Sequence, residues 1–342
     1  MSEIQKYLQK IALRQDLTQE ESSRAFQIVL MGGATPAQIA ALLMGLRAKG
    51  ETIEELAGAA IVLRSRSGKV AAPENALDTC GTGGDSASTL NVSTAVALVV
   101  AACGIPVAKH GNRAVSSKSG SADVLKMLGV NVDASQGIVE KSLKEAGICF
   151  MMAPRFHTAM KHVAPIRQEL GIRTIFNLLG PLCNPASTQY HLLGVYATKW
   201  VEPMAKVLRS LGAKRAWVVH GSDGMDELTT TGISHVASLE DGEIRCFEIS
   251  PEDAGLPFAS STDLMGEAPA YNAQELKDLL RGKLGAYRDI VLLNAAASLV
   301  VCGIGKNLKD GVEIAAKAID SGNAMQTLQK LVEISNQGES NV

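Results

Sequence analysis

The sequence predicts an α/β protein with a small all-helical N-terminal domain, residues 1–68, and a larger α/β domain, residues 69–342, built on a mainly parallel central sheet. Two patterns predict this class. Residues 1–68 show helical periodicity only, with short turns between the helices. From residue 69 onward, short apolar runs alternate with helical segments, which is typical of a parallel sheet covered on both faces.

Each N-terminal helix is predicted by its own signals. In the first helix, Ile4, Tyr7, Leu8 and Ile11 share one face. The start signals of the next three helices are Thr18 with Glu21, Thr35–Pro36 with Gln38, and Thr52 with Glu55. Glycines at positions 32, 33 and 50 end the second and third helices. Four short helices joined by short turns predict a compact helical unit.

Strands and helices then alternate along the chain. The predicted strands are residues 76–78, 105–108, 130–132, 192–196 and 216–220, and the predicted helices are 94–103, 121–128, 136–146 and 201–211. Residues 160–185 interrupt this alternation with helix-like sequence, and we expect about 160–190 to pack back on the N-terminal helices. Residues 236–265 predict strands and loops. The C-terminal part returns to helices, with a strongly apolar stretch at 294–301.

Bulk composition excludes several classes of function. The chain has 342 residues, of which 46% are hydrophobic and 20% charged, a normal globular balance. The formal net charge of -2 provides no global attraction to nucleic acid. No run reaches the roughly 18–20 apolar residues that span a bilayer, and the N-terminus lacks the apolar run of a signal peptide. We therefore expect a cytoplasmic protein without nucleic-acid or membrane partners.

The six cysteines are scattered along the chain and form no C-x-x-C pair. This spacing argues against a zinc site and against a disulfide framework. Free buried thiols are the expected state in a reducing cytoplasm.

A glycine-rich turn follows the first predicted strand and contains Gly81, Gly83 and Gly84. Glycines let the backbone approach an anion without a Cβ in the way. The helix expected to begin near residues 91–94 adds free N–H groups and the positive end of its dipole. The spacing matches neither G-x-G-x-x-G nor G-x-x-x-x-G-K-[ST]. A tight turn with an ordinary helix cap is the alternative that these residues leave open.

A basic turn, residues 109–113, follows the second predicted strand and reads Lys-His-Gly-Asn-Arg. Two cations, an amide and a glycine suit a phosphate or a carboxylate. Ligands of open α/β sheets bind at the carboxyl ends of the strands, and both turns flank one βαβ unit. We therefore expect the two turns to lie side by side. A solvated basic loop is the alternative.

Two adjacent carboxylates, Asp226 and Glu227, follow the strand predicted at 216–220. They repel each other unless a cation lies near them, and carboxylates together with phosphate oxygens suit Mg²⁺. Taken alone, the pair is equally typical of an acidic turn that ends a strand.

The stretch from His157 to Arg173 is rich in basic residues. His157 and Lys161 are i,i+4 neighbours, but the sequence offers no further zinc ligands at suitable spacing. Arg167 beside apolar residues suits bidentate capture of a flat carboxylate, and a surface arginine is the alternative.

Taken together, five segments resemble the anthranilate phosphoribosyltransferase family. They are residues 81–85, 91–94, 109–123, 172–181 and 226–227, and they occur in the family's order over nearly the whole chain. The glycine turn is shared with related enzymes. The basic run combined with the segment 167–181 is far more specific.

The resemblance implies a nucleoside phosphorylase/phosphoribosyltransferase-like architecture, with a homodimer interface on the helical domain. It implies transfer of the phosphoribosyl group of phosphoribosyl pyrophosphate to the amino group of anthranilate. The products would be N-(5-phosphoribosyl)anthranilate and pyrophosphate, in tryptophan biosynthesis. Mg²⁺ is the implied cofactor.

The resemblance also implies roles for residues at matching positions. Those implied to bind phosphoribosyl pyrophosphate are Gly81, Gly83, Gly84, Asp85, Thr89, Asn91, Ser93, Thr94, Lys109 and Ser121. Those implied to hold Mg²⁺ are Ser93, Asp226 and Glu227. Those implied to meet anthranilate are Gly81, Asn112 and Arg167, with His110 and His157 along its route. No general base is assigned, because the aniline-type amine needs little deprotonation before it attacks.

Two other functions stay open from the sequence. A pyrimidine nucleoside phosphorylase shares the architecture but uses inorganic phosphate and a nucleoside; residues 109–113 and the segment around Arg167 argue against it. A nucleic-acid-binding protein of the same fold would have a basic groove and no enzyme activity. The net charge of -2 and the intact pair of Asp226 and Glu227 argue against that.

Overall fold

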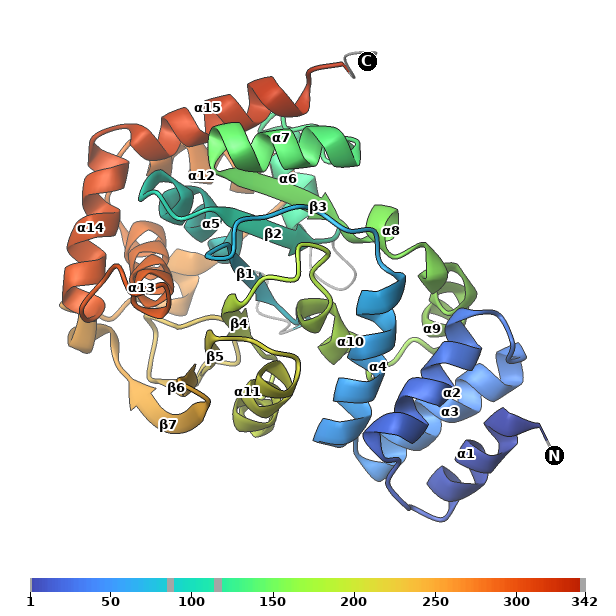
Figure 1. Cartoon of the computed structure of the whole chain (residues 1–342). Coiled ribbons are helices and arrows are strands. Elements are labelled where there is room, and N and C mark those ends of the chain that lie inside the picture. The colour runs from blue at the N-terminus through green and yellow to red at the C-terminus, as the bar shows by residue number, and fades with distance from the viewer. Residues whose placement is uncertain (1, 85–88, 114–118, 339–342) are drawn as a thin grey trace.

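The computed structural model of the chain describes residues 2–84, 89–113 and 119–338. Figure 1 shows four helices at the N-terminal end and, beside them, a central sheet with helices on both faces. The N-terminal helices are α1 (Glu3–Ala12), α2 (Gln19–Leu30), α3 (Pro36–Lys49) and α4 (Ile53–Arg66). The expected architecture, a small helical part followed by a larger α/β part, is confirmed.

Capping boxes begin the second, third and fourth helices, as predicted. The hydroxyl groups of Thr18, Thr35 and Thr52 accept hydrogen bonds from backbone N–H groups three residues later, at 3.2, 3.3 and 3.2 Å. In each box the third residue's side chain also accepts a bond from the cap's own N–H. These bonds satisfy N–H groups that a helix start otherwise leaves without partners.

A later part of the chain completes the core of these helices. It contains α8 (Ala153–Phe156), α9 (Ala164–Leu170) and α10 (Phe176–Leu179). Val163, Ile166 and Phe176 are buried in the same apolar cluster as the residues of α2, α3 and α4. The rings of Phe26 and Phe176 meet edge to face, with centroids 5.7 Å apart. The N-terminal helices therefore share their core with residues more than a hundred positions away.

The sheet has seven strands in the order β3-β2-β1-β4-β5-β6-β7. Their bounds are β1 (Leu77–Gly81), β2 (Val107–Gly111), β3 (Ile148–Met152), β4 (Tyr190–Gly194), β5 (Arg215–Gly221), β6 (Ser234–Glu240) and β7 (Glu243–Ile249). The first five are parallel, whereas β6 and β7 pair antiparallel at one edge. The expectation of a mainly parallel sheet is confirmed.

Helices cover both faces of the sheet (Figure 1). One face packs on α5 (Val92–Ala102), α6 (Ser121–Met127), α12 (Pro269–Leu280), α13 (Ala286–Val301), α14 (Leu308–Asp320) and α15 (Asn323–Ser335). The other face packs on α7 (Gln136–Ala146), near β3, and α11 (Val201–Ser210), near β5. In β3, Ile148 and Phe150 face the first layer while Cys149 and Met151 face the second. Double coverage explains why these strands are continuously apolar.

One strand prediction is wrong and one strand was missed. Residues 130–132 form no strand: a turn begins at Val132, the N–H of Asp133 donates to the side chain of Asn131, and the N–H of Asn131 donates to the Ser335 hydroxyl. Val130 and Val132 are nonetheless buried, which explains their apolar pattern. The strand that follows the helix is β3, which begins directly after Gly147.

Three expectations concern membrane helices, disulfides and a zinc site. No helix within the described residues is long and apolar enough to cross a bilayer. All six cysteines carry free thiols, but the expectation that they are buried is wrong for Cys246 on β7, which is exposed, and Cys103 and Cys302 are only half-buried. Over the same described ranges, no three His, Cys, Asp or Glu side chains are grouped in a way that would hold a metal ion by themselves.

Candidate active site

The predicted site residues lie at or after the carboxyl ends of four of the five parallel strands. These five strands end at Gly81, Gly111, Met152, Gly194 and Gly221. The glycine turn continues from the end of β1, His157 follows β3, and the acidic pair follows β5. The predicted turn at 109–113 is wrong in its first part, because residues 109–111 belong to β2 and only 112–113 follow it. The carboxyl edge of a parallel sheet is where such folds bind ligands.

Two glycines in register on neighbouring strands admit the acidic loop. Gly81 of β1 and Gly194 of β4 are partners, and β4 lies between β1 and β5. A Cβ on Gly194 would collide with the backbone carbonyl of Asp226, and a Cβ on Gly81 would collide with the Asp226 carboxylate. Without side chains here, the loop after β5 can cross β4 and reach the turn after β1.

The glycine turn is held by this acidic loop and by the end of β4. The N–H of Gly83 donates to Oδ2 of Asp226 at 2.7 Å. The N–H of Thr82 donates to the Gly194 carbonyl at 2.9 Å. Gly83 and Gly84 have φ of 67° and 73°, a region that other residues rarely adopt. The turn therefore has a defined position beside a carboxylate. Asp85 lies outside the described residues.

The start of α5 brings Glu227 next to the turn. Oε1 of Glu227 accepts from the Ser93 N–H at 3.2 Å, in the first turn of the helix, where a negative charge is favoured. Asn91 precedes the helix, and its Oδ1 accepts from Nδ2 of Asn272 at 2.9 Å. Thr94 is almost fully buried. Thr89 pairs with Met265 in an isolated bridge.

Lys109 lies buried between the two turns. Its Nζ donates to the carbonyl oxygen of Thr79 at 2.5 Å and to Oγ of Ser93 at 3.2 Å. Burial lowers the pKa of Lys109, and the charge of Asp78, foremost among its acidic neighbours, opposes that shift. An ammonium has three N–H donors, so a third donor is available for a ligand beside Ser93.

His110 and His157 form a buried pair on the other side of β2. Their ring centroids are 5.1 Å apart. Burial, with the neighbouring His157 as a second cause, lowers the pKa of His110 to about 3; burial also lowers the pKa of His157. Both rings are therefore neutral at physiological pH. Within the described part of the chain, neither Nε2 has a hydrogen-bond partner. Two buried nitrogen atoms without partners favour a bound polar ligand.

The buried Asp78 carboxylate accepts hydrogen bonds from two separate segments of the site. Its Oδ1 accepts from the His110 N–H at 3.2 Å, and its Oδ2 accepts from Nδ2 of Asn184 at 2.7 Å. The same amide nitrogen of Asn184 donates to the Ala108 carbonyl at 2.8 Å. The sequence predicted no role for either residue, although Asp78 directly precedes the glycine-rich stretch, because buried hydrogen-bonding roles have no local pattern.

Two further predicted residues border the basic turn. Asn112 is exposed, and its carbonyl accepts from the Ala122 N–H at 3.2 Å. Ser121 begins α6. Residues 114–118, which belong to the predicted basic run, lie outside the described residues.

Arg167 lies on α9 with its guanidinium over the ring of Phe176, 5.2 Å from the centroid. Arg167 is half-buried, and this partial burial lowers its pKa. No hydrogen bond joins it to Asn112 among the described residues. Arg173, to which the sequence gave no role, donates from Nη2 to the carbonyl of Gly84. A single arginine in a loop shows no sequence pattern from which this contact could be predicted.

The residues fit Mg²⁺ in the way that phosphate-binding enzymes hold it. Magnesium is usually bound by one or two carboxylates together with substrate phosphates and water. Asp226 and Glu227 each reach backbone N–H groups of an anion-binding element, the glycine turn and the start of α5. Ser93 adds a hydroxyl beside them. Two carboxylates and one hydroxyl are a suitable partial ligand set, which phosphate oxygens would complete.

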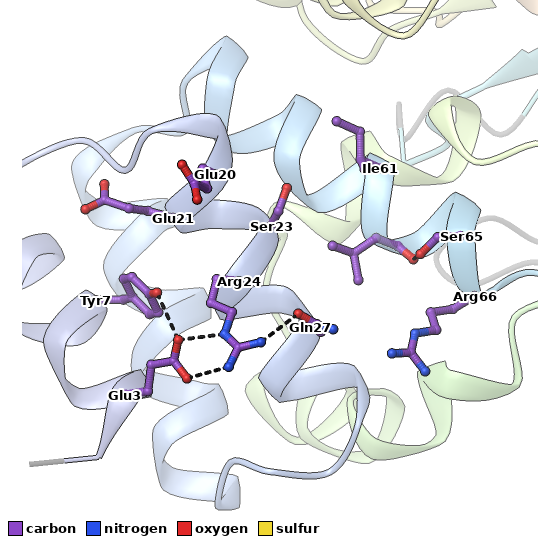
Figure 2. A pocket seen from close by; sticks show the side chains of 11 residues that line it. Glu3, Tyr7, Glu20, Glu21, Ser23, Arg24, Gln27, Ile61, Ser65 and Arg66 are labelled. Carbon is purple, nitrogen blue, oxygen red and sulfur yellow. Dashed lines mark hydrogen bonds and ion pairs between the residues drawn. The ribbon is translucent and has the colours of Figure 1, made fainter.

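A separate hollow of about 560 Å³ lies on the helical part (Figure 2). Its lining residues come from α1, α2 and α4 alone. Arg24 points to Glu3, whose carboxylate accepts from Nε at 2.6 Å and from Nη2 at 2.9 Å, and Arg24 also donates to Gln27. These charges satisfy each other, so this hollow lacks the features of a phosphate site.

The sequence and the fold are similar to those of known proteins. Residues 5–67 match the helical bundle domain of a glycosyl transferase family, and residues 73–325 match its a/b domain. The anthranilate phosphoribosyltransferase of Parvibaculum lavamentivorans is 57% identical over 100% of both chains. The crystal structure of anthranilate phosphoribosyltransferase (TrpD) from Thermus thermophilus has a TM-score of 0.92 and 40% identity, covering 96% of this chain and 99% of that one.

A further structure, anthranilate phosphoribosyltransferase from Saccharomyces cerevisiae in complex with PRPP and Mg, has a TM-score of 0.89 and 29% identity over 97% of each chain. The fold and the carboxyl-edge site define a transferase of the glycosyl transferase family. Within it, the chain belongs to the anthranilate phosphoribosyltransferases.

Proposed function

We propose that the loops at the carboxyl edge of the sheet bind the two substrates of the family reaction side by side. That reaction transfers the phosphoribosyl group of phosphoribosyl pyrophosphate to the amino group of anthranilate, in tryptophan biosynthesis. It releases pyrophosphate and gives N-(5-phosphoribosyl)anthranilate. The rest of this proposal concerns which residues do what.

The proposed phosphoribosyl pyrophosphate site comprises the glycine turn, the start of α5 and the buried lysine. Its residues are Gly81, Gly83, Gly84, Asp85, Thr89, Asn91, Ser93, Thr94, Lys109 and Ser121. Asp226, Glu227 and Ser93 would hold Mg²⁺. The observation that carries this assignment is the pair of hydrogen bonds that the Gly83 N–H donates to Asp226 and the Ser93 N–H donates to Glu227. Carboxylates set among anion-binding N–H groups suit a cation shared with phosphate.

The chemistry of these residues suits departure of pyrophosphate. As the bond from the sugar carbon to oxygen breaks, negative charge gathers on the leaving group. Backbone N–H groups of the turn and the Lys109 ammonium are fixed before the reaction, so they stabilise that charge without reorganising. Mg²⁺, when bound, adds a Lewis acid that neutralises the same charge.

Anthranilate would be met by Gly81, Asn112 and Arg167, with His110 and His157 along its route. A guanidinium forms strong paired bonds with a carboxylate. The histidines are neutral, so they add no charge, and their unpartnered Nε2 atoms suit the amino group. Catalysis would then depend on holding that amine within about 3–3.5 Å of the sugar carbon. We assign no general base.

We also propose that the protein is a homodimer. The resemblance to the family supports this proposal. Exposed apolar side chains on the N-terminal helices and their connections are compatible with it, including Leu13, Met31 and Met44, with exposed fractions of 71%, 59% and 44%. Light scattering would measure the mass in solution, and a monomer at micromolar concentration would contradict the proposal.

The test of the reaction follows anthranilate fluorescence after addition of phosphoribosyl pyrophosphate, with Mg²⁺ and then with EDTA. We expect loss of the signal with release of pyrophosphate, inhibition by EDTA, and recovery on adding Mg²⁺. Folded protein that consumes no anthranilate would refute the reaction. Activity that persists in EDTA would refute the role of the metal.

Substitution of Arg167 tests the anthranilate site. We expect Arg167→Ala to raise the KM for anthranilate by about tenfold or more, because a charged hydrogen bond is lost. Binding of phosphoribosyl pyrophosphate, measured by calorimetry, should stay nearly intact. An equal loss of affinity for both substrates would contradict the assignment.

A further inference from the structure

Arg173 contacts the glycine turn from a part of the chain far away in the sequence. It lies in the loop after α9, and its Nη2 donates to the carbonyl oxygen of Gly84. Its guanidinium lies over the ring of Tyr196, 4.6 Å from the centroid. The contact therefore joins the turn after β1 to the segment that carries Arg167.

Tyr196 is a fixed platform for this arginine. Its backbone N–H donates to Oγ1 of Thr82 at 3.0 Å, so it also holds the glycine turn. Its hydroxyl oxygen accepts from Nε1 of Trp200 at 3.0 Å, and Trp200 is 5% exposed. A ring anchored at both ends keeps the guanidinium above it in one place.

The turn needs such support because of its glycines. Gly83 and Gly84 have positive φ and no side chains of their own to pack. Glycine backbones lose more conformational freedom on ordering than any other residue. Asp226 holds the Gly83 N–H on one side, and Arg173 holds the Gly84 carbonyl on the other. A turn fixed before the ligand arrives binds it more tightly, since less ordering remains to be done.

We propose that Arg173 is a positioning residue for phosphoribosyl pyrophosphate. Together with Tyr196 it holds the turn at Gly83 and Gly84 in the form that receives the pyrophosphate. Through the loop after α9 it also links that turn to the anthranilate side of the site. The residue must be arginine, because only a planar guanidinium both stacks on a ring and donates at its edge. This inference rests on the proposed function.

The test is calorimetric titration of the full-length protein with phosphoribosyl pyrophosphate and Mg²⁺, without anthranilate. In Arg173→Ala, Arg173→Lys and Tyr196→Leu we expect Kd to rise by about ten- to a hundredfold. Each change should remove or displace the hydrogen bond between the charged guanidinium and the Gly84 carbonyl. Tyr196→Phe keeps the ring and should bind within about threefold of the unmodified protein, since only one neutral hydrogen bond is lost. Millimolar guanidinium should restore part of the affinity of Arg173→Ala, which a purely structural defect would not show.

Lys199→Met is the matched control. In the unmodified protein the Lys199 ammonium lies over the ring of Trp200, 5.3 Å from the centroid, next to Tyr196, and Lys199 is exposed. We expect unchanged affinity. Thermal melting checks folding, and if Arg173→Ala does not fold, Arg173→Lys and Tyr196→Leu decide the matter.

Wild-type affinity in Arg173→Lys would mean that a positive charge alone holds the turn. Wild-type affinity in Tyr196→Leu would mean that the arginine holds the turn without the ring. Either result would overturn the proposal. A wild-type protein that transfers no phosphoribosyl group would overturn the proposed function instead. Active wild-type protein with unaffected variants overturns the role of Arg173 only.

Discussion

Adding one methyl group at Gly81 should damage the acidic side of the site without unfolding the protein. In Gly81→Ala the new Cβ would collide with Oδ2 of Asp226 and would lie 2.7 Å from its Cγ. Normal contacts between carbon atoms begin at about 3.5 Å, so the carboxyl group must move by at least roughly 0.8 Å. The backbone carbonyl of Asp226 is 3.3 Å away, a tight distance that the chain can absorb.

That movement has a definite consequence for binding. The Asp226 carboxylate now accepts from the Gly83 N–H at 2.7 Å, and a shift of this size would break the bond. A hydrogen bond to a charged group contributes about 1.5–3 kcal/mol, which corresponds to about ten- to a hundredfold in affinity. We expect Kd for phosphoribosyl pyrophosphate with Mg²⁺ to rise by that factor.

Calorimetry of phosphoribosyl pyrophosphate with Mg²⁺ measures the loss, and the fluorescence assay measures turnover. Gly137→Ala is the matched control, because this glycine lies in the first turn of α7 and its Cβ would meet nothing within 4 Å. Both variants should melt close to the unmodified protein. If Gly81→Ala binds its ligand within a factor of about two of the control, less than 0.5 kcal/mol, then the contact between Gly81 and Asp226 does not position the metal ligand.

Two further predictions concern stability. Burial lowers the pKa of His110 and of His191 to about 3, so the unfolded chain takes up their protons first as pH falls below about 6.5. The free energy of unfolding should therefore drop between about pH 6.5 and 3, by at most ~2.7 kcal/mol per pH unit for the two residues. The free energy of unfolding, measured with urea across this pH range, should fall less steeply with decreasing pH in His191→Gln. An unchanged dependence on pH would contradict this. Arg288, which is 6% exposed, pairs with Asp320 at 2.7 and 2.8 Å. Asp320→Ala should lower the free energy of unfolding by about 1–2 kcal/mol, discounted because Asp320 itself is well exposed, and any change in KM would argue against a purely structural role.

Much of the fold could be predicted from local signals. Capping pairs such as Thr18 with Glu21 gave the helix starts, because their hydrogen bonds span three residues. Position in the sheet was harder to predict. Val130 and Val132 are apolar because they are buried in a connection between two helices, whereas the strand at Ile148–Met152 begins directly after the glycine that ends α7. An apolar pattern reports burial, and burial alone does not distinguish a strand from a turn.

The candidate site could be predicted as separate loops but not as a set of contacts. Asp226 meets Gly83 because β4 lies between β1 and β5, and this strand order is not visible in the sequence. The contact of Arg173 with Gly84 depends in addition on how the segment after α9 folds back. The carbonyl of Asp226 occupies the space that a side chain at Gly194 would take, and no local pattern in the sequence indicates this contact.

The shared core of the N-terminal helices has a consequence for synthesis on the ribosome. Helices α1 to α4 leave the ribosome before Val163, Ile166 and Phe176, which help to close their core and are translated about a hundred residues later. At roughly 5–20 residues per second, the early helices wait about 5–20 seconds with an open apolar side. During that interval the nascent chain is a natural substrate for chaperones.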